Sequence, residues 1–321
     1  MVDGTPLTSA RALYALSTLL GDTSRVASVV AAFESWDDLV GATPYELMAR
    51  LGPWAGSLHI PATCPLPPFP GKGVRVSGRF DHTYPPDLAA MPLSPPLLYQ
   101  RGNLPAAPLV AVGGVHDPSV PAIERAKATG SICAEHGFGM AGLVDTGTGR
   151  AALEVAVDGG APCIAVLGSG LGSPSAHDRL INRVLAAGGA AVSVRGPGSS
   201  WSERATIESS AVVAALSTVV VVPEFGTHLA GGIALVESAL ELGRPLVACL
   251  PGPAGVPIWA STLLVRGRRL LDSEGRIDLP PELQSNERAL LRALIGDPIA
   301  DVVVGSADEL ANAIAAAVRG T

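Results

Sequence analysis

The sequence predicts an α/β protein built on a Rossmann-like parallel sheet with helices on both faces, and two observations carry this prediction. The first is composition. Of 321 residues, 48% are hydrophobic and only 16% are charged, which suits a sheet buried on both sides. The second is that short apolar runs alternate with helical stretches, as in βαβ units. The expected strands cover 109–112, 163–167, 190–194, 219–222 and 245–249, and the expected helices cover 119–136, 149–158, 175–187, 205–216 and 232–242.

A small helical domain is expected in front of the sheet, over residues 1–60. Apolar residues recur there at helical spacing, and Thr43 followed by Pro44 marks one helix start. Prolines then crowd residues 61–73, which indicates a stiff extended linker. The Rossmann-like domain is expected over 74–321, with a charged insertion at 258–285 and no separate C-terminal domain.

Charge, cysteine and histidine patterns exclude several classes of protein. The 22 basic and 29 acidic residues leave a net charge of −7, so only a local patch could bind nucleic acid. The four cysteines lack C-x-x-C spacing and are expected to be buried thiols, and the six histidines lack ligand spacing, so we expect no metal and no cofactor. With no signal-peptide pattern and no apolar run of roughly 18 residues, the protein is expected to be soluble and cytoplasmic.

Glycine-rich turns follow the expected strands, where a parallel sheet binds its ligands. Glycine lets backbone N–H groups approach an anion, and the next helix adds the positive end of its dipole. These turns therefore predict a phosphate-type ligand. The alternative is structural, since tight turns need glycine in any case and the hydroxyls of Ser169 and Thr227 could be helix N-caps. The candidate residues are Gly113, Gly114, Gly168, Ser169, Gly170, Gly226, Thr227, Gly231 and Gly232.

Charged and aromatic side chains near these turns add to the candidate site. Arg150, Arg179 and Arg183 could form a basic patch beside the turns, or could be ordinary surface arginines. Glu224 at a strand end and Arg101 are candidates for orienting a ligand. Trp201 lies in a Gly- and Ser-rich loop, where it could stack on a base or anchor the loop. Of the histidines, 116, 177 and 228 each follow a strand. No set of side chains indicates catalysis.

Several motifs, in the right order over roughly residues 7–257, resemble one known family. They are Tyr-Pro-x-x-Leu at 84–88, Pro-Pro-Leu-Leu-Tyr-x-Arg-Gly-Asn-Leu at 95–104, Ile-Ala-Val-Leu-Gly-Ser-Gly-Leu at 164–171, and Glu-Leu-Gly-Arg-Pro at 241–245 closed by Pro-Gly at 251–252. This pattern is similar to that of the DprA/Smf DNA-processing family, in which a small helical domain also precedes the sheet.

The resemblance implies a dimeric protein that binds single-stranded DNA in the cytoplasm during natural transformation and DNA recombination, and that helps to load a RecA-type recombinase without a known enzymatic reaction. The chain departs from the family at three basic positions. Val115 replaces an arginine, Asp145 replaces a basic residue, and the family's Arg-Asn-Arg aligns with residues 209–211 (Ser-Ser-Ala). Such losses weaken phosphate binding, because charge carries much of single-strand affinity.

These departures leave two other functions open. One is a module on the same fold that binds a nucleotide or a phosphorylated small ligand. Residues 223–227 (Pro-Glu-Phe-Gly-Thr) partly resemble the motif of the lonely guy phosphoribohydrolases, but Ala230 stands where that motif has glutamate, so hydrolysis is less expected. The other is a scaffold whose ancestral site has decayed.

Overall fold

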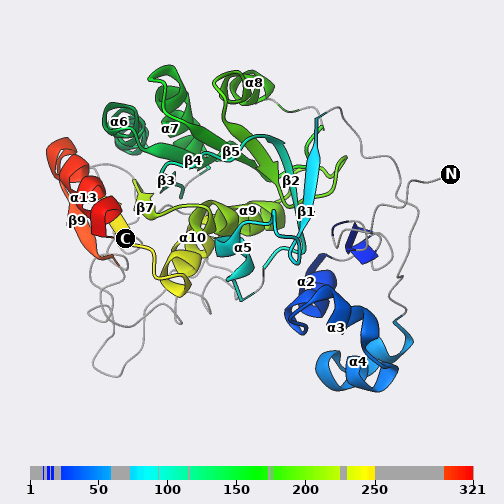
Figure 1. The fold of residues 1–321 in the computed structure, drawn as a ribbon. Coiled ribbons are helices and arrows are strands. Elements are labelled where there is room, and N and C mark those ends of the chain that lie inside the picture. Colours follow the sequence, from blue (N-terminus) through cyan, green and yellow to red (C-terminus); the bar gives the residue numbers. More distant parts are fainter. Residues whose placement is uncertain are drawn as a thin grey trace, which may run out of the picture.

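The computed structural model describes residues 10, 13–14, 16–17, 23–58, 73–92, 94–114, 116–172, 175, 177–224, 230–249 and 300–320. They form a helical unit followed by a nine-stranded sheet with helices on both faces (Figure 1). The strands are β1 (Arg75–Gly78), β2 (Leu97–Gly102), β3 (Leu109–Val112), β4 (Gly139–Leu143), β5 (Cys163–Leu167), β6 (Ala190–Ser193), β7 (Val219–Val222), β8 (Leu246–Cys249) and β9 (Val302–Val304). The α/β class expected from the sequence is confirmed.

The order of the strands places a topological switch point in the middle of the sheet. The order is β1-β2-β6-β5-β4-β3-β7-β8-β9, and the seven strands from β6 to β9 run parallel. From β3 the chain builds outward to β6 and then returns to place β7 on the other side of β3. Ligands of such sheets bind beyond the carboxyl ends of the strands near this reversal.

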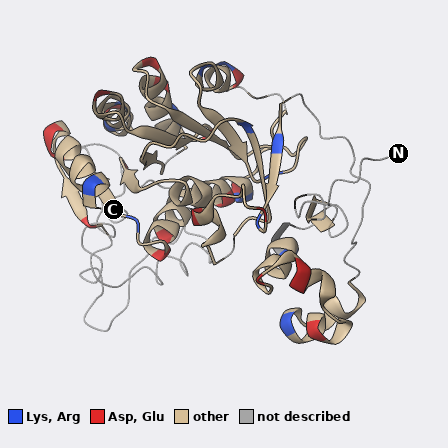
Figure 2. Ribbon diagram, in the orientation of Figure 1, with Lys and Arg blue, Asp and Glu red and all other residues tan. Residues whose placement is uncertain are grey.

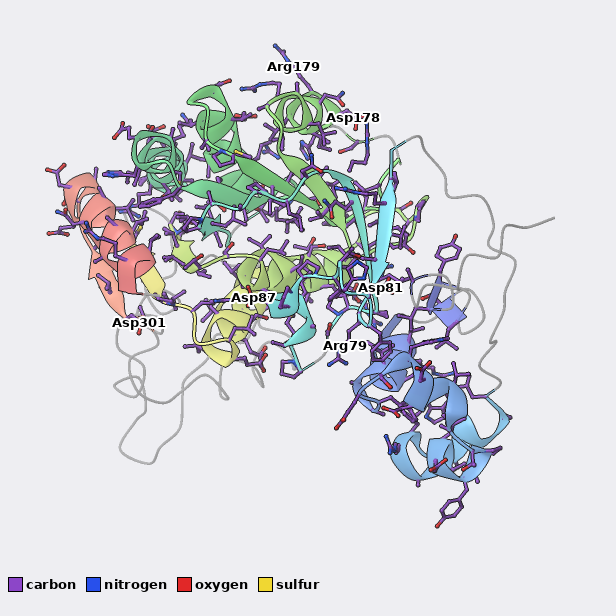
Figure 3. All side chains as sticks on the ribbon, in the orientation of Figure 1. Arg79, Asp81, Asp87, Asp178, Arg179 and Asp301 are labelled. Carbon is purple, nitrogen blue, oxygen red and sulfur yellow. The ribbon has the colours of Figure 1, made fainter. Side chains whose placement is uncertain are left out.

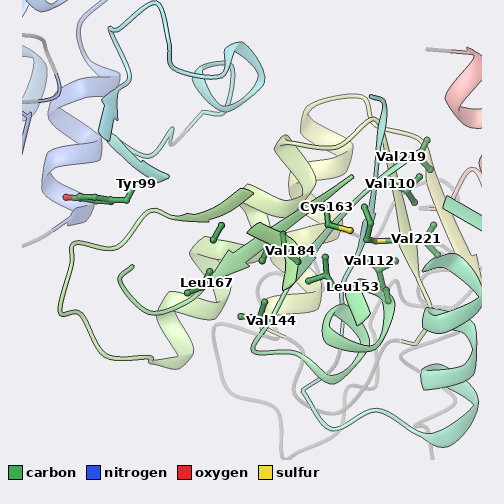
Figure 4. Close-up of a cluster of buried hydrophobic side chains, with 14 of the residues drawn as sticks. Tyr99, Val110, Val112, Val144, Leu153, Cys163, Leu167, Val184, Val219 and Val221 are labelled. Atoms are coloured by element: carbon green, nitrogen blue, oxygen red, sulfur yellow. The ribbon is translucent and has the colours of Figure 1, made fainter. Parts of the chain in front are cut away.

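Helices cover both faces of the sheet. Those of the sheet domain are α5 (Pro86–Ala89), α6 (Val120–His136), α7 (Gly147–Asp158), α8 (Asp178–Ala186), α9 (Glu203–Ala215), α10 (Ala230–Glu241) and α13 (Ala307–Gly320). The α6, α7, α8 and α13 helices pack on one face, where Val110, Val112 and Val221 are buried beside Leu153 (Figure 4). The α5, α9 and α10 helices pack on the other face. Residues of one strand thus alternate between two apolar layers.

All five strands expected from the sequence are present, and a strand between two of them was missed. The missed strand is β4, whose sequence, Gly-Met-Ala-Gly-Leu, has low strand propensity. Its glycines are required by close packing, because a Cβ at Gly139 would lie 3.0 Å from the carbonyl oxygen of Pro162, and one at Gly142 would lie 2.9 Å from that of Gly149. The antiparallel strands β1 and β2 at the sheet edge were also missed.

The helical unit comprises α2 (Thr23–Ala31), α3 (Trp36–Gly41), α4 (Pro44–Leu51) and the 3-10 helix η1 (Pro53–Ser57). The Thr43 side chain caps α4, as its sequence predicts. Tyr14, which precedes α2 in the chain, packs its ring edge-on against Tyr99 of β2, with 6.5 Å between the ring centroids. Of the expected linker only Gly73 is among the described residues, and the expected insertion at 258–285 lies outside them. The domain boundaries stay a prediction.

Candidate functional site

The described residues at the switch point between β3 and β7 are closely packed. Gly114 has a φ of +131°, and a Cβ there would lie 2.7 Å from the carbonyl oxygen of Glu224. Gly113 packs against Leu235 of α10. The Glu224 side chain, which is buried, accepts hydrogen bonds from the Ser119 hydroxyl and from the Ser119 backbone N–H at 3.2 Å. Glu224 therefore binds the N-terminus of α6, where a ligand anion would otherwise be favoured.

Two backbone N–H groups of the glycine turn after β5 are also occupied by internal hydrogen bonds. The Gly168 N–H donates to Oδ2 of Asp145 at 2.7 Å, and the Gly170 N–H donates to the Ser199 carbonyl at 2.9 Å. A Cβ at Gly170 would clash with the Gly196 carbonyl, so these two turns are in close contact. Two N–H groups predicted to face a phosphate are thus occupied, and one of them is held by a carboxylate.

One aromatic and four ionisable side chains gather beside this turn. The Trp201 side chain lies against Gly168, where a Cβ would be 3.2 Å from Cδ1 of the indole, and Trp201 remains 49% exposed. The His116 ring centroid lies 6.1 Å from that of Trp201. Arg150 and His177 lie in the same region, with the Arg150 guanidinium donating to the Val144 carbonyl at 3.4 Å. We call His116, Asp145, Arg150, Gly168, His177 and Trp201 the carboxyl-edge site.

Electrostatics inside the carboxyl-edge site are mixed. Burial lowers the pKa of His177 below its usual value, and the positive charge of Arg150 lowers it further, while Asp145 acts in the opposite direction. His177 is therefore mainly neutral at pH 7. Thr148, in the first turn of α7, is buried, and among the described residues its hydroxyl has no hydrogen-bond partner. Buried hydroxyls are usually paired, so this turn of the site has an unused polar group.

The arginines chosen from the sequence do not gather at this site. Arg183 pairs with Asp158 near the far end of α7, and Arg179 projects outward from α8 into solvent (Figure 3). Arg101 is opposite Ala191 in the β2–β6 register, toward the amino end of the parallel strands. Only Arg150 of the candidate basic residues reaches the carboxyl edge. Basic and acidic residues are interspersed along the described ribbon in this view (Figure 2).

Two arginines near the carboxyl end of β6 were missed by sequence reasoning. Arg195 follows β6 and bonds Glu208 at 3.1 Å, and Arg204 in the first turn of α9 bonds the same carboxylate at 3.2 Å. Ser209 and Ser210, which align with the first two residues of the family's Arg-Asn-Arg, are buried in α9 about one turn beyond Arg204. The helix expected over 205–216 begins two residues late, so Arg204, which lies in the first turn of α9 and three residues after Trp201, fell outside it.

The remaining candidates are placed as follows. Gly231 and Gly232 lie in the first turn of α10, and Gly231 packs against Thr206 and Ser210 of α9. The Ser169 carbonyl accepts a hydrogen bond from the Ser193 hydroxyl at 2.8 Å. Gly226 and Thr227 lie outside the described residues, as does His228.

The described cysteines are buried, as expected from the sequence. Burial raises the pKa of Cys163 to about 12 and that of Cys249 to about 11, and it raises the pKa of Cys133 as well. These thiols stay protonated at neutral pH and are unreactive. In the described parts of the chain, no three His, Cys, Asp or Glu side chains are placed to hold a metal ion. No described helix is both long and apolar enough to cross a membrane.

Comparison with known families now identifies the chain. The sequence profile of DNA recombination-mediator protein A matches residues 75–266, more than half of the chain. The chain belongs to this DprA family. No curated protein matches it in sequence. The family profile begins at β1 and spans every strand of the sheet except β9.

Solved structures of DprA proteins share this fold. The crystal structure of DprA from Streptococcus pneumoniae is 19% identical with a TM-score of 0.59, and the match covers 95% of this chain and 98% of that one. DNA processing protein A from Helicobacter pylori, studied for its single-stranded DNA binding mode, is 17% identical with a TM-score of 0.51, over 61% of this chain and 88% of that one. At these identities the likeness establishes the fold alone.

Proposed function

We propose that this protein binds single-stranded DNA at the carboxyl-edge site, with Trp201 as the surface on which a base stacks. The observation that carries the proposal is the position of Trp201, which is half exposed, lies on the glycine turn after β5 and is next to His116. Every base has a π-face, so stacking on an exposed indole tolerates any sequence. Bases of a duplex are already stacked on one another, so the same surface favours the single strand.

The charges around Trp201 support moderate rather than tight binding. Arg150 at the start of α7 is available to a phosphate, and Arg195 and Arg204 flank the loop that carries Trp201. Asp145 opposes them, and Glu208 neutralises part of the charge of the two flanking arginines. Few phosphates are therefore neutralised, and the affinity should depend only moderately on salt concentration.

Membership of the DprA family extends the proposal to a cellular role. We infer that the protein acts in the cytoplasm as a homodimer, protects single strands during natural transformation and recombination, and assists RecA loading. The dimer is tested by light scattering coupled to size exclusion. The RecA role is tested by the rate at which RecA assembles on DNA coated with single-strand binding protein, with and without this protein. A monomer, or an unchanged assembly rate, would remove that part of the proposal.

The decisive experiment is fluorescence anisotropy of a labelled single-stranded oligonucleotide at low and moderate salt, with a duplex of the same length as control. We expect salt-sensitive binding that prefers the single strand. Because stacking contributes about 1–3 kcal/mol per base, Trp201→Ala should weaken binding about 5- to 160-fold. The matched control is Trp54→Ala, since Trp54 is a second exposed tryptophan, on the helical unit.

Two results would refute the proposal. One is absence of binding to the single strand at low salt. The other is equal loss of affinity in the Trp201→Ala and Trp54→Ala variants.

A nucleotide-binding module is the second candidate function. The internal hydrogen bonds of Gly168 and Gly170 favour it, because they leave few backbone N–H groups to bind the successive phosphates of a DNA strand. The indole of Trp201 is still exposed and can stack on one base. A thermal-shift screen with mononucleotides distinguishes it. A shift with a mononucleotide, together with no binding of the oligonucleotide, would favour this function over DNA binding.

A further inference from the structure

A second recess, separate from the carboxyl-edge site, lies between the helical unit and the helices on the other face of the sheet. Its volume is about 460 Å³, and it is bounded by α2, by residues 91, 92, 95 and 96, and by α9 and α10. This volume is in the range of sites that bind a small ligand or a few side chains. We call this recess the α9–α10 groove. None of the candidates chosen from the sequence lines it.

The groove has an apolar floor. Met91, Pro96, Ile207, Ala211 and Ala234 all line it. Ile207 and Ala211 are one turn apart on α9 and are only partly buried, so their apolar surface is still in contact with solvent. A concave, mainly apolar surface of this kind is typical of binding sites in folded proteins.

Carboxylates line the rim of the groove, and they differ in their partners. Glu208 is neutralised by Arg195 at 3.1 Å and Arg204 at 3.2 Å. Glu237 and Glu241 are one turn apart on α10, and neither forms an ion pair with any other residue that the structure describes. Burial and the neighbouring Glu241 charge raise the pKa of Glu237. A cation placed between these two carboxylates would relieve their repulsion.

We propose that the α9–α10 groove docks a segment of a partner protein that inserts apolar side chains and places a lysine or arginine beside Glu237 and Glu241. The charges exclude nucleic acid, since the two unpaired carboxylates repel phosphate. The apolar floor excludes a purely polar ligand. A helix with apolar side chains at i and i+3 or i+4 and a basic residue next to them satisfies both surfaces. This inference is independent of DNA binding at the carboxyl edge.

A selection of phage-displayed random 12-residue peptides tests the proposal. The full chain is the target, and an excess of the Ala211→Arg variant is present in solution as competitor. The new arginine side chain fills the groove, and its positive charge repels the basic residue of a peptide. If thermal melting shows that Ala211→Arg is not folded, Ile207→Glu is a second variant that blocks the groove. We expect enriched peptides to carry paired apolar residues and at least one lysine or arginine. Their affinity should fall at least tenfold in either blocking variant.

A charge variant tests the role of the rim. Glu237→Gln with Glu241→Gln should weaken the selected peptides about three- to tenfold, in the range of partly buried ion pairs. Glu135→Gln, an exposed carboxylate on α6 at the opposite face, should leave them unchanged. Three results would overturn the proposal. They are no enrichment over the competitor, enriched peptides that bind the charge variant equally well, or a wild-type dimer that Ala211→Arg dissociates, which would make the groove a contact between copies of this chain.

Discussion

Replacing Asp145 by asparagine tests how far a single carboxylate limits nucleic-acid binding at the carboxyl edge. Asp145 accepts the Gly168 N–H at 2.7 Å, and Gly168 is the residue on which Trp201 packs. An asparagine oxygen can accept the same hydrogen bond, so the turn should keep its geometry while the negative charge is lost. A phosphate about 8 Å away would be relieved of about 0.5 kcal/mol of repulsion in water and about 2 kcal/mol at a protein surface.

We therefore expect Asp145→Asn to tighten single-strand binding about twofold to thirtyfold in the anisotropy assay at low salt. Higher salt should reduce the gain, because exposed charges are screened over about 10 Å at 0.1 M ionic strength. Glu135→Gln removes one negative charge far from the site and controls for net charge. Equal affinities of the two variants, or weaker binding by Asp145→Asn with an unchanged melting temperature, would refute the reasoning.

Three further predictions follow from the contacts described above. Arg183→Ala should leave single-strand affinity within about twofold of wild type, because Arg183 pairs with Asp158 away from the carboxyl edge and exposed pairs contribute little; a tenfold loss by anisotropy would place Arg183 in the site. As pH falls below about 6.5, His177 of the unfolded chain takes up a proton before His177 of the folded chain does, so the free energy of unfolding decreases. In urea titrations at pH 7.5 and 5.5, the His177→Asn variant should therefore show a smaller decrease in this free energy than wild type. An equal decrease in the two proteins would contradict this prediction. Gly170→Ala should lower the free energy of unfolding by about 1–3 kcal/mol because the new Cβ meets a backbone carbonyl, and an unchanged urea midpoint would show that the turn can shift.

Much of the sheet could be predicted because its signals are local. The bounds of β3, β5 and β7 agree with the expected runs, since uncharged β-branched residues and the turns around them are adjacent in sequence. The hydroxyls of Ser119 and Thr146 cap α6 and α7, which are also local interactions, although neither residue was singled out from the sequence. Strand β4 was missed because its glycines are chosen by contacts with residues elsewhere in the chain.

The site could be predicted only in part. The sequence suggested a base-stacking role for Trp201 and a common edge for His116, His177 and His228. The structure places Trp201, His116 and His177 at the carboxyl edge, His228 lies outside the described residues, and the binding role itself stays a prediction. The glycine turns were expected to face a phosphate. Their N–H groups instead meet Asp145 and Ser199, which lie 23 and 29 residues away from the glycines they bind.

By itself, then, the sequence determined the fold class, the family and the positions of the five apolar strands β3, β5, β6, β7 and β8, because hydrophobic periodicity, turn residues and contiguous motifs are properties of neighbouring residues. Only the tertiary structure decided which charges remain available. Arg183 is neutralised by Asp158, the N-terminus of α6 is occupied by Glu224 from beyond β7, and Glu237 and Glu241 are left unpaired beside an apolar groove. Charge pairing depends on distances between elements that are far apart in the chain, and those distances are set only when the helices pack on the sheet.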